Sequence, residues 1–238
     1  WTQNRYALFR RLWRALGISA EFMIKDIRNS KNLRVYLAQL CEIKSRLEFI
    51  SAYNNVDKDR FVIESYALQV RMLIELLAYS LIAIHRTKYR DFRLNAQRDF
   101  AKDWNGRNII NNVLKLNPDM FFRPIESNFQ IAHDGVKQVH IKNHDCYSLK
   151  KLGKLYDKCG GVLHAANPWD NSTKAESFHN ELPSIISKLN NTISNHVVLV
   201  NHWKHQTSTA IIFTLNGENN NPCYYMSLAT GNFEFKNA

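Results

Sequence analysis

Two adjacent glycines, Gly160 and Gly161, precede a histidine, His164, in the stretch LYDKCGGVLHAANPW. An imidazole has a pKa near 6.5 and can act as a general acid or base, and the nearby Lys158 can present a positive charge to a phosphate. At 3.6 residues per turn, Asp157, the glycines and His164 share one stripe of a helix, so bare main chain lies beside the imidazole. Lys158 lies about 120° around the helix and about 9 Å along it from His164, so the pair can border one cleft without touching.

The two glycines also raise a question of stability. Two glycines inside a helix cost about 2 kcal/mol relative to alanine, so either a neighbouring segment needs the bare backbone or this stretch is not a helix. Ser148 is a suitable N-cap, and Asn167-Pro168 is a stop signal. We therefore expect one helix over 148–166.

A second group of polar residues lies in the apolar stretch ESYALQVRMLIELL. Glu64, Arg71 and Glu75 recur at helical spacing, and Arg71 and Glu75 form an i,i+4 pair. A buried charge needs a partner, so a structural ion pair is the first interpretation. The alternative is that Arg71 faces His164 across the core and supplies a guanidinium there.

The histidines permit a metal interpretation, which we weigh against the missing motifs. His140, His144 and Cys146 form one potential ligand group, and His202 and His205 form another. No HExxH or paired CxxC accompanies them, and no P-loop, GxGxxG or GxSxG occurs. We expect no metal and no cofactor.

The elements that must position these residues are predominantly helical. Hydrophobic periodicity and capping signals predict helices over 33–53, 57–85, 106–116, 148–166 and 174–194. Residues 117–147 have little periodicity and read as a long, partly irregular connection. After Asn195, the segments HVVLVNHW, STAIIFTL and CYYMSLA predict a three-stranded antiparallel β-meander that packs on the helices.

The chain begins with a basic segment, WTQNRYALFRRLWRAL, which reads as an amphipathic helix. Its aromatic side chains alternate with arginines, a composition that can bind nucleic acid by charge and stacking. The alternative is that the aromatic face docks on the body of the protein or on a partner chain. The candidate nucleic-acid-binding residues are Arg5, Arg10, Arg11 and Arg14.

The net charge of +11 is concentrated in the first half of the chain. Residues 1–116 hold 21 of the 32 Lys and Arg but only 11 of the 21 Asp and Glu. A localised basic excess favours polyanions such as nucleic acid, or an acidic partner, although a basic solvated surface is the simpler alternative.

The four scattered cysteines do not suggest a disulfide framework, and the apolar window at 68–84 contains Arg71 and Glu75. We therefore expect a cytoplasmic protein that does not enter a membrane.

The arrangement Lys158-CGGVL-His164, after a hydrophobic helical hairpin, resembles the motif of the HEPN superfamily. In that superfamily an Arg is followed by a His four to six residues later, on a late helix of a compact helical bundle. This chain has Lys158 in place of the Arg, and a lysine lacks the planar bidentate fork. The resemblance implies a mainly α, HEPN-like bundle over 31–195, with a basic arm at 1–30 and the β-meander at 196–238 as additions.

The resemblance also implies a function. Many members are metal-independent endoribonucleases of toxin–antitoxin or phage-defence systems, and others are non-catalytic modules that dimerise through the late helix. By this resemblance His164 is the general acid or base, Lys158 stabilises the phosphorane charge, Asp157 orients the ring, and Arg71 is a further catalytic candidate. The expected partners are RNA, a second copy of the chain, and an antitoxin or defence-complex subunit. In the dimeric alternative, the glycines admit a partner backbone and His164 is a packing residue.

Overall fold

The computed structural model describes eight stretches of the chain: residues 30–52, 59–95, 105–116, 121–126, 130–131, 137–164, 173–202 and 207–230. Its helices are α3 (Lys31–Ser51), α4 (Arg60–Ile84), α5 (Arg86–Asn95), α6 (Gly106–Leu116), α7 (Leu149–Leu163) and α8 (Lys174–Ile193). Its strands are β1 (Arg123–Pro124), β2 (Gln130–Ile131), β3 (Lys137–Gln138), β4 (Asn195–His202), β5 (Thr207–Thr214) and β6 (Cys223–Thr230), with the short 3-10 helix η3 (Glu218–Asn220) before β6. The protein is mainly helical with a small antiparallel sheet near its C-terminal end, which confirms the predicted fold class.

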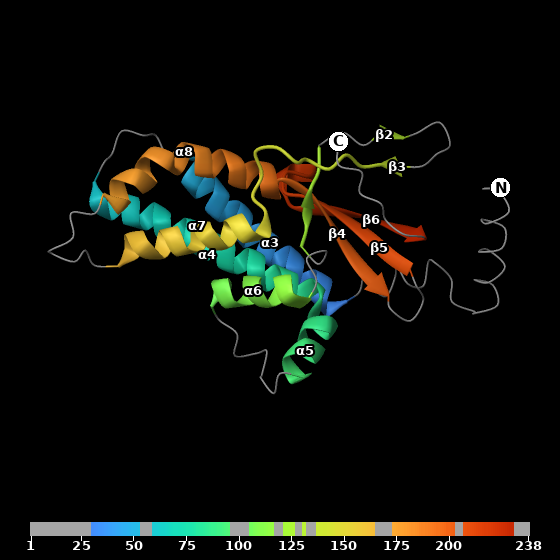
Figure 1. The fold of residues 1–238 in the computed structure, drawn as a ribbon. Coiled ribbons are helices and arrows are strands. Elements are labelled where there is room, and N and C mark those ends of the chain that lie inside the picture. The colour runs from blue at the N-terminus through green and yellow to red at the C-terminus, as the bar shows by residue number, and fades with distance from the viewer. Residues whose placement is uncertain are drawn as a thin grey trace, which may run out of the picture.

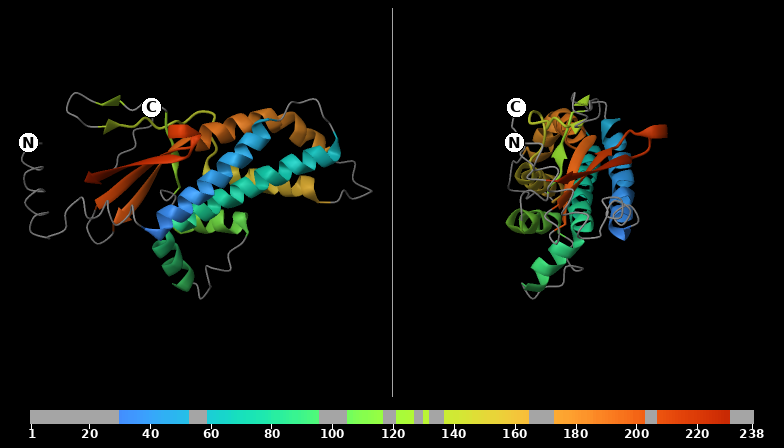
Figure 2. Two further views of the ribbon diagram at one scale, coloured as in Figure 1. Left: turned by 180° about the vertical axis from the view of Figure 1, so that it is seen from behind. Right: turned by 90° about the vertical axis from the view of Figure 1, so that its right-hand side faces the viewer.

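The helix α4 is the centre of the bundle. It lies between α3 on one side and α7 on the other, with α6 and α8 beside α7 (Figure 1; Figure 2, right). Its sequence is apolar on most sides, as expected for a helix that packs against five others. By length and composition α4 could cross a membrane, but 56% of its most apolar window is buried inside the protein. That burial is typical of a core helix.

The sheet packs at one end of the bundle (Figure 1). Its strand order is β1-β4-β5-β6, and all neighbours are antiparallel. The three long strands match the predicted meander, and the two-residue strand β1 adds a fourth that the prediction missed. Side chains of the sheet, such as Val198, Ile211 and Phe213, belong to the same hydrophobic cluster as those of the helices.

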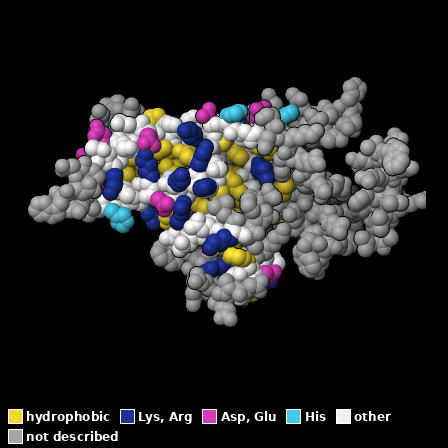
Figure 3. Space-filling view, viewed as in Figure 1, with side chains coloured by type: hydrophobic (Ala, Val, Ile, Leu, Met, Phe, Trp, Pro, Cys, Tyr) yellow, Lys and Arg dark blue, Asp and Glu magenta, His cyan; other side chains and the backbone are white. Residues whose placement is uncertain are grey.

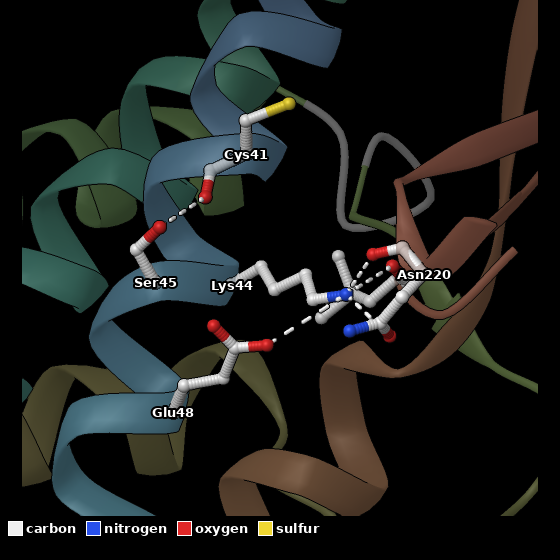
Figure 4. A network of polar contacts seen from close by, with 6 residues as sticks. Cys41, Lys44, Ser45, Glu48 and Asn220 are labelled. Atoms are coloured by element: carbon white, nitrogen blue, oxygen red, sulfur yellow. Dashed lines mark hydrogen bonds and ion pairs between the residues drawn. The ribbon is translucent and has the colours of Figure 1, made fainter.

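A buried lysine fastens the sheet to the bundle. Lys44 of α3 is 8% exposed and donates hydrogen bonds to the backbone and the side-chain oxygen of Asn220, the latter at 2.8 Å (Figure 4). Asn219 and Asn220 both have positive φ, a conformation that asparagine tolerates better than most residues. The turn before β6 therefore presents its oxygens to α3.

The helix α7 begins where predicted and ends earlier. Ser148 is its N-cap, with its hydroxyl accepting from the Lys151 N–H. The helix stops at Leu163, and His164 is the C-cap with extended backbone (φ −77°, ψ 142°), so the prediction of a helix to residue 166 was wrong. Gly160 and Gly161 lie in the last turn, where poor helix formers weaken continuation of the helix.

Candidate functional site

His164 is exposed at the C-terminal end of α7. Its backbone N–H donates to the carbonyl of Gly160 at 3.2 Å, which fixes its main chain against the last turn. No hydrogen bond or ion pair joins its ring to another residue in the described part of the chain. The imidazole is therefore open to solvent, as a general acid or base would need to be.

Lys158 is engaged with the neighbouring helix. Its Nζ lies 2.5 Å from Oε1 of Glu181 on α8, which also accepts from the Ser177 hydroxyl at 3.2 Å. The hydrogen bond from Lys158 lowers the pKa of Glu181 below its usual value. Both side chains are partly exposed, so the pair is a weak surface link.

Asp157 is paired with an arginine that the sequence reasoning did not single out. Its Oδ2 lies 3.5 Å from Nη1 of Arg107, in the first turn of α6. The Arg107 guanidinium rests on Gly153, where a Cβ would overlap Nη1 and lie 3.1 Å from Cζ. Because α6 and α7 are far apart in sequence, only the combination of a lone glycine and a distant arginine could have indicated this contact.

Arg71 is held by two side chains at the junction of α4 and α7. Its Nη2 donates to the hydroxyl of Tyr156 at 2.8 Å, and that hydroxyl donates to Oε1 of Glu75 at 2.8 Å. Arg71 Nε lies 3.6 Å from the same carboxylate oxygen, which confirms the predicted i,i+4 ion pair. The guanidinium also lies over the Tyr156 ring, 4.3 Å from its centroid, a cation–π contact. Burial and the bond to Glu75 raise the pKa of Tyr156 to about 12.

Gly160 is the place where Arg71 reaches α7. A Cβ at this position would lie 3.0 Å from Nη1 of Arg71, tighter than ordinary van der Waals contact. Arg71 thus touches the residue whose carbonyl accepts the His164 N–H. A Cβ at Gly161, by contrast, would meet only Lys174 Cδ at 3.8 Å. The bare backbone of Gly153 and Gly160 admits two arginine side chains of the same chain, which accounts for Gly160, whereas no neighbouring residue requires a glycine at Gly161.

The sequence-predicted site residues therefore contact different parts of the protein. Lys158 forms an ion pair with a residue of α8, Asp157 forms one with a residue of α6, and Arg71 of α4 contacts Gly160. Within the described residues, none of the three side chains forms a hydrogen bond or ion pair with the His164 ring. Arg5, Arg10, Arg11 and Arg14 lie outside the described residues.

The exposed side of α7 is strongly basic. Lys150, Lys151 and Lys154 are exposed, and Lys158 is partly exposed; at 100° per residue the four lysines fall within an arc of about 100°. We refer to these four lysines together with His164 as the basic face of α7. Figure 3 shows that Lys and Arg side chains gather over α7 on the side of the molecule drawn in Figure 1. The only carboxylate within α7 is Asp157.

The described residues contain no group of three His, Cys, Asp or Glu side chains that could hold a metal ion. The Cys146 thiol of the His140–Cys146 segment donates to the Asn191 carbonyl at 3.6 Å; the side chains of His202 and His205 lie outside the described part. Cys159 is buried, and burial raises its pKa to about 12, so it is not a nucleophile at neutral pH.

Comparisons of the chain with protein-family models, with curated proteins and with solved structures found no match.

Proposed function

We propose that this protein is an RNA-binding, HEPN-like protein and that the basic face of α7 contacts the phosphate backbone. The observation that carries the proposal is the exposure of Lys150, Lys151 and Lys154 along one helix with a single carboxylate among them. Exposed like charges along a helix face repel one another and do not stabilise the helix. A polyanion that neutralises them releases its own counterions, which favours binding.

A second candidate function is metal-independent RNA cleavage at the C-terminal end of the same face. The supporting observation is that Arg71 contacts Gly160 one turn before the exposed His164. In such a reaction the ribose 2′ oxygen attacks the adjacent phosphorus and the bond to the 5′ oxygen breaks, leaving a 2′,3′-cyclic phosphate and a 5′-hydroxyl. His164 would move a proton at one of these oxygens, and Arg71 or Lys158 would stabilise the charge on the phosphorane.

The third candidate is a non-catalytic interaction module that forms a homodimer or holds a partner such as an antitoxin or a defence-complex subunit. The setting in toxin–antitoxin or phage-defence systems, and the cytoplasmic location, rest on the resemblance and on the composition of the chain. Because Gly160 already admits Arg71, a partner helix is not needed to account for that glycine. This favours RNA binding over dimerisation as the role of α7.

The test separates binding from cleavage. The purified protein is incubated in EDTA with end-labelled single-stranded RNA, beside His164→Ala and the control variant His144→Ala, which changes another exposed histidine. Binding by all three proteins with cleavage lost only in His164→Ala supports the nuclease. Binding without cleavage in all three supports an RNA-binding module. No binding at low salt by any of them contradicts the proposal.

A further inference from the structure

Arg107 lies on α7 in a way that stability alone does not explain. Its guanidinium rests on the bare backbone of Gly153, and 34% of the side chain remains exposed. A glycine in the second turn of a helix is less favourable than alanine. The ion pair with the half-exposed Asp157, at 3.5 Å, is a weak surface pair. The arrangement therefore fixes the position of a guanidinium without a matching gain in stability.

The position of that guanidinium is at the edge of the basic face. Gly153 lies three residues after Lys150 and four before Asp157, so all three share one side of α7. Arg107 thus adds a planar, bidentate donor beside a row of lysines, which are point charges. The carboxylate of Asp157 lies 3.5 Å from Nη1 of this fork and forms an ion pair with it.

We propose that Arg107, seated on Gly153, is a phosphate-binding subsite of the basic face, and that Asp157 is the internal carboxylate that occupies it until RNA binds. This inference rests on the proposed function and adds a residue to it. The phosphodiester replaces the carboxylate on the guanidinium, and the displaced Asp157 repels the backbone. Asp157 thereby lowers the affinity for RNA. It also makes RNA binding depend more strongly on a phosphate that lies in position to contact Arg107.

A charge-neutral variant tests the subsite. In Gly153→Ala the new methyl group displaces the end of the flexible Arg107 side chain while the net charge is unchanged. The matched control is Gly161→Ala on the same helix, where the methyl group finds room. We expect Gly153→Ala to bind a fluorescent single-stranded RNA about tenfold more weakly. The slope of log K against log salt should fall in magnitude by about 0.7, the value for one lost phosphate contact. Gly161→Ala should match the parent protein.

Two further variants keep the test decisive if Gly153→Ala also perturbs the helix. Arg107→Gln should weaken binding similarly, and adding Gly153→Ala to it should change nothing more, because both act through one guanidinium. Asp157→Asn should tighten binding about threefold in the parent and less in the Arg107→Gln background.

The outcomes distinguish this inference from the proposed function. If the parent binds RNA through the lysines but Gly153→Ala and Arg107→Gln bind equally well, the subsite is refuted and the proposed function stands. If the parent does not bind RNA, both fail. Equal tightening by Asp157→Asn in both backgrounds would show that Asp157 acts by charge alone and does not occupy Arg107.

Discussion

At the scale of single residues, burial strongly perturbs His196. It is fully enclosed, and its ring contacts Phe122, Phe213 and Tyr36. Its Nδ1 lies 2.8 Å from the Ile193 carbonyl, which can only accept, so Nδ1 carries the hydrogen and Nε2 accepts from the Tyr36 hydroxyl at 2.8 Å. Burial lowers the pKa of His196 from 6.5 to about 4. The neutral ring is thus the form that the core holds.

This burial predicts a loss of stability in mild acid. Above pH 6.5 the ring is neutral in both states and has no effect. Between pH 6.5 and about 4 the unfolded chain binds a proton that the native protein does not, so the free energy of unfolding falls as the pH is lowered. The contribution of His196 is about 3 kcal/mol over this range.

Urea unfolding at pH 7, 5.5 and 4.5 measures this loss of stability on acidification, with His196→Phe as the comparison. The variant is expected to be less stable at pH 7 but to lose less stability on acidification. Parallel pH profiles for the two proteins would contradict the assignment.

The adjacent glycines of α7 predict opposite responses to alanine. Gly161→Ala should raise the free energy of unfolding by about 0.5–1 kcal/mol, because alanine favours the helix and the methyl group has space. Gly160→Ala should not raise the free energy of unfolding in this way, because its methyl group lies against Arg71 and disturbs the hydrogen bonds that link Arg71, Tyr156 and Glu75. Denaturant unfolding of the two variants, side by side, gives the comparison. Equal stabilisation by both would mean that Arg71 does not need the space at Gly160.

The sequence predicted these residues unevenly, and the reason is physical. The pair Arg71–Glu75 was predicted correctly because an i,i+4 contact depends only on local helix geometry. The contacts of Lys158 with Glu181 and of Asp157 with Arg107 depend on how α8 and α6 pack against α7. Spacing along one helix contains no information on such packing, so the sequence indicated neither contact.

At the scale of elements, Lys44 holds the turn before β6 to α3 (Figure 4). Lys44→Met keeps the aliphatic chain but removes the donor from Asn220 and from the Leu215 carbonyl. We expect a loss of about 1–3 kcal/mol in the free energy of unfolding. Amide exchange should accelerate in residues 215–223 and change little in α7. The control is Ser45→Ala, whose hydroxyl bonds the Cys41 carbonyl on the exposed side of α3. Unchanged amide exchange at 215–223 in Lys44→Met would show that Lys44 does not hold this turn to α3.

The elements themselves were predicted well where their patterns are long. The apolar stripe of α4 and the β-branched runs of β4, β5 and β6 extend over whole elements, so periodicity identified them. The strand β1 has two residues and exists because Arg123 and Pro124 pair with Val197 and His196. A partner so distant in sequence leaves no local signal. The helix α5 was missed because it has ten residues, of which only Tyr89, Phe92 and Leu94 are apolar.

At the scale of the whole molecule, the lysines of α7 are separated from the core. The core cluster joins α3, α4, α6, α7, α8 and the sheet, whereas the lysines of α7 remain outside it. The helices α3 and α7 lie on opposite sides of α4 (Figure 2), so each presents a different surface to a partner. We propose that RNA binds to the surface of α7 and not to that of α3.

A matched pair of double variants tests that claim most directly. Lys151→Ala/Lys154→Ala removes two exposed charges, three residues apart near the start of α7. Lys31→Ala/Arg34→Ala removes two exposed charges with the same spacing near the start of α3. The two variants have the same net charge. A difference between their affinities for single-stranded RNA, measured across salt concentrations, therefore reports where the removed charges lie. We predict that the α7 variant binds at least tenfold more weakly and that its salt slope is smaller by about 1.4, while the α3 variant changes little. Equal effects of the two variants, or no effect of either, would contradict the account.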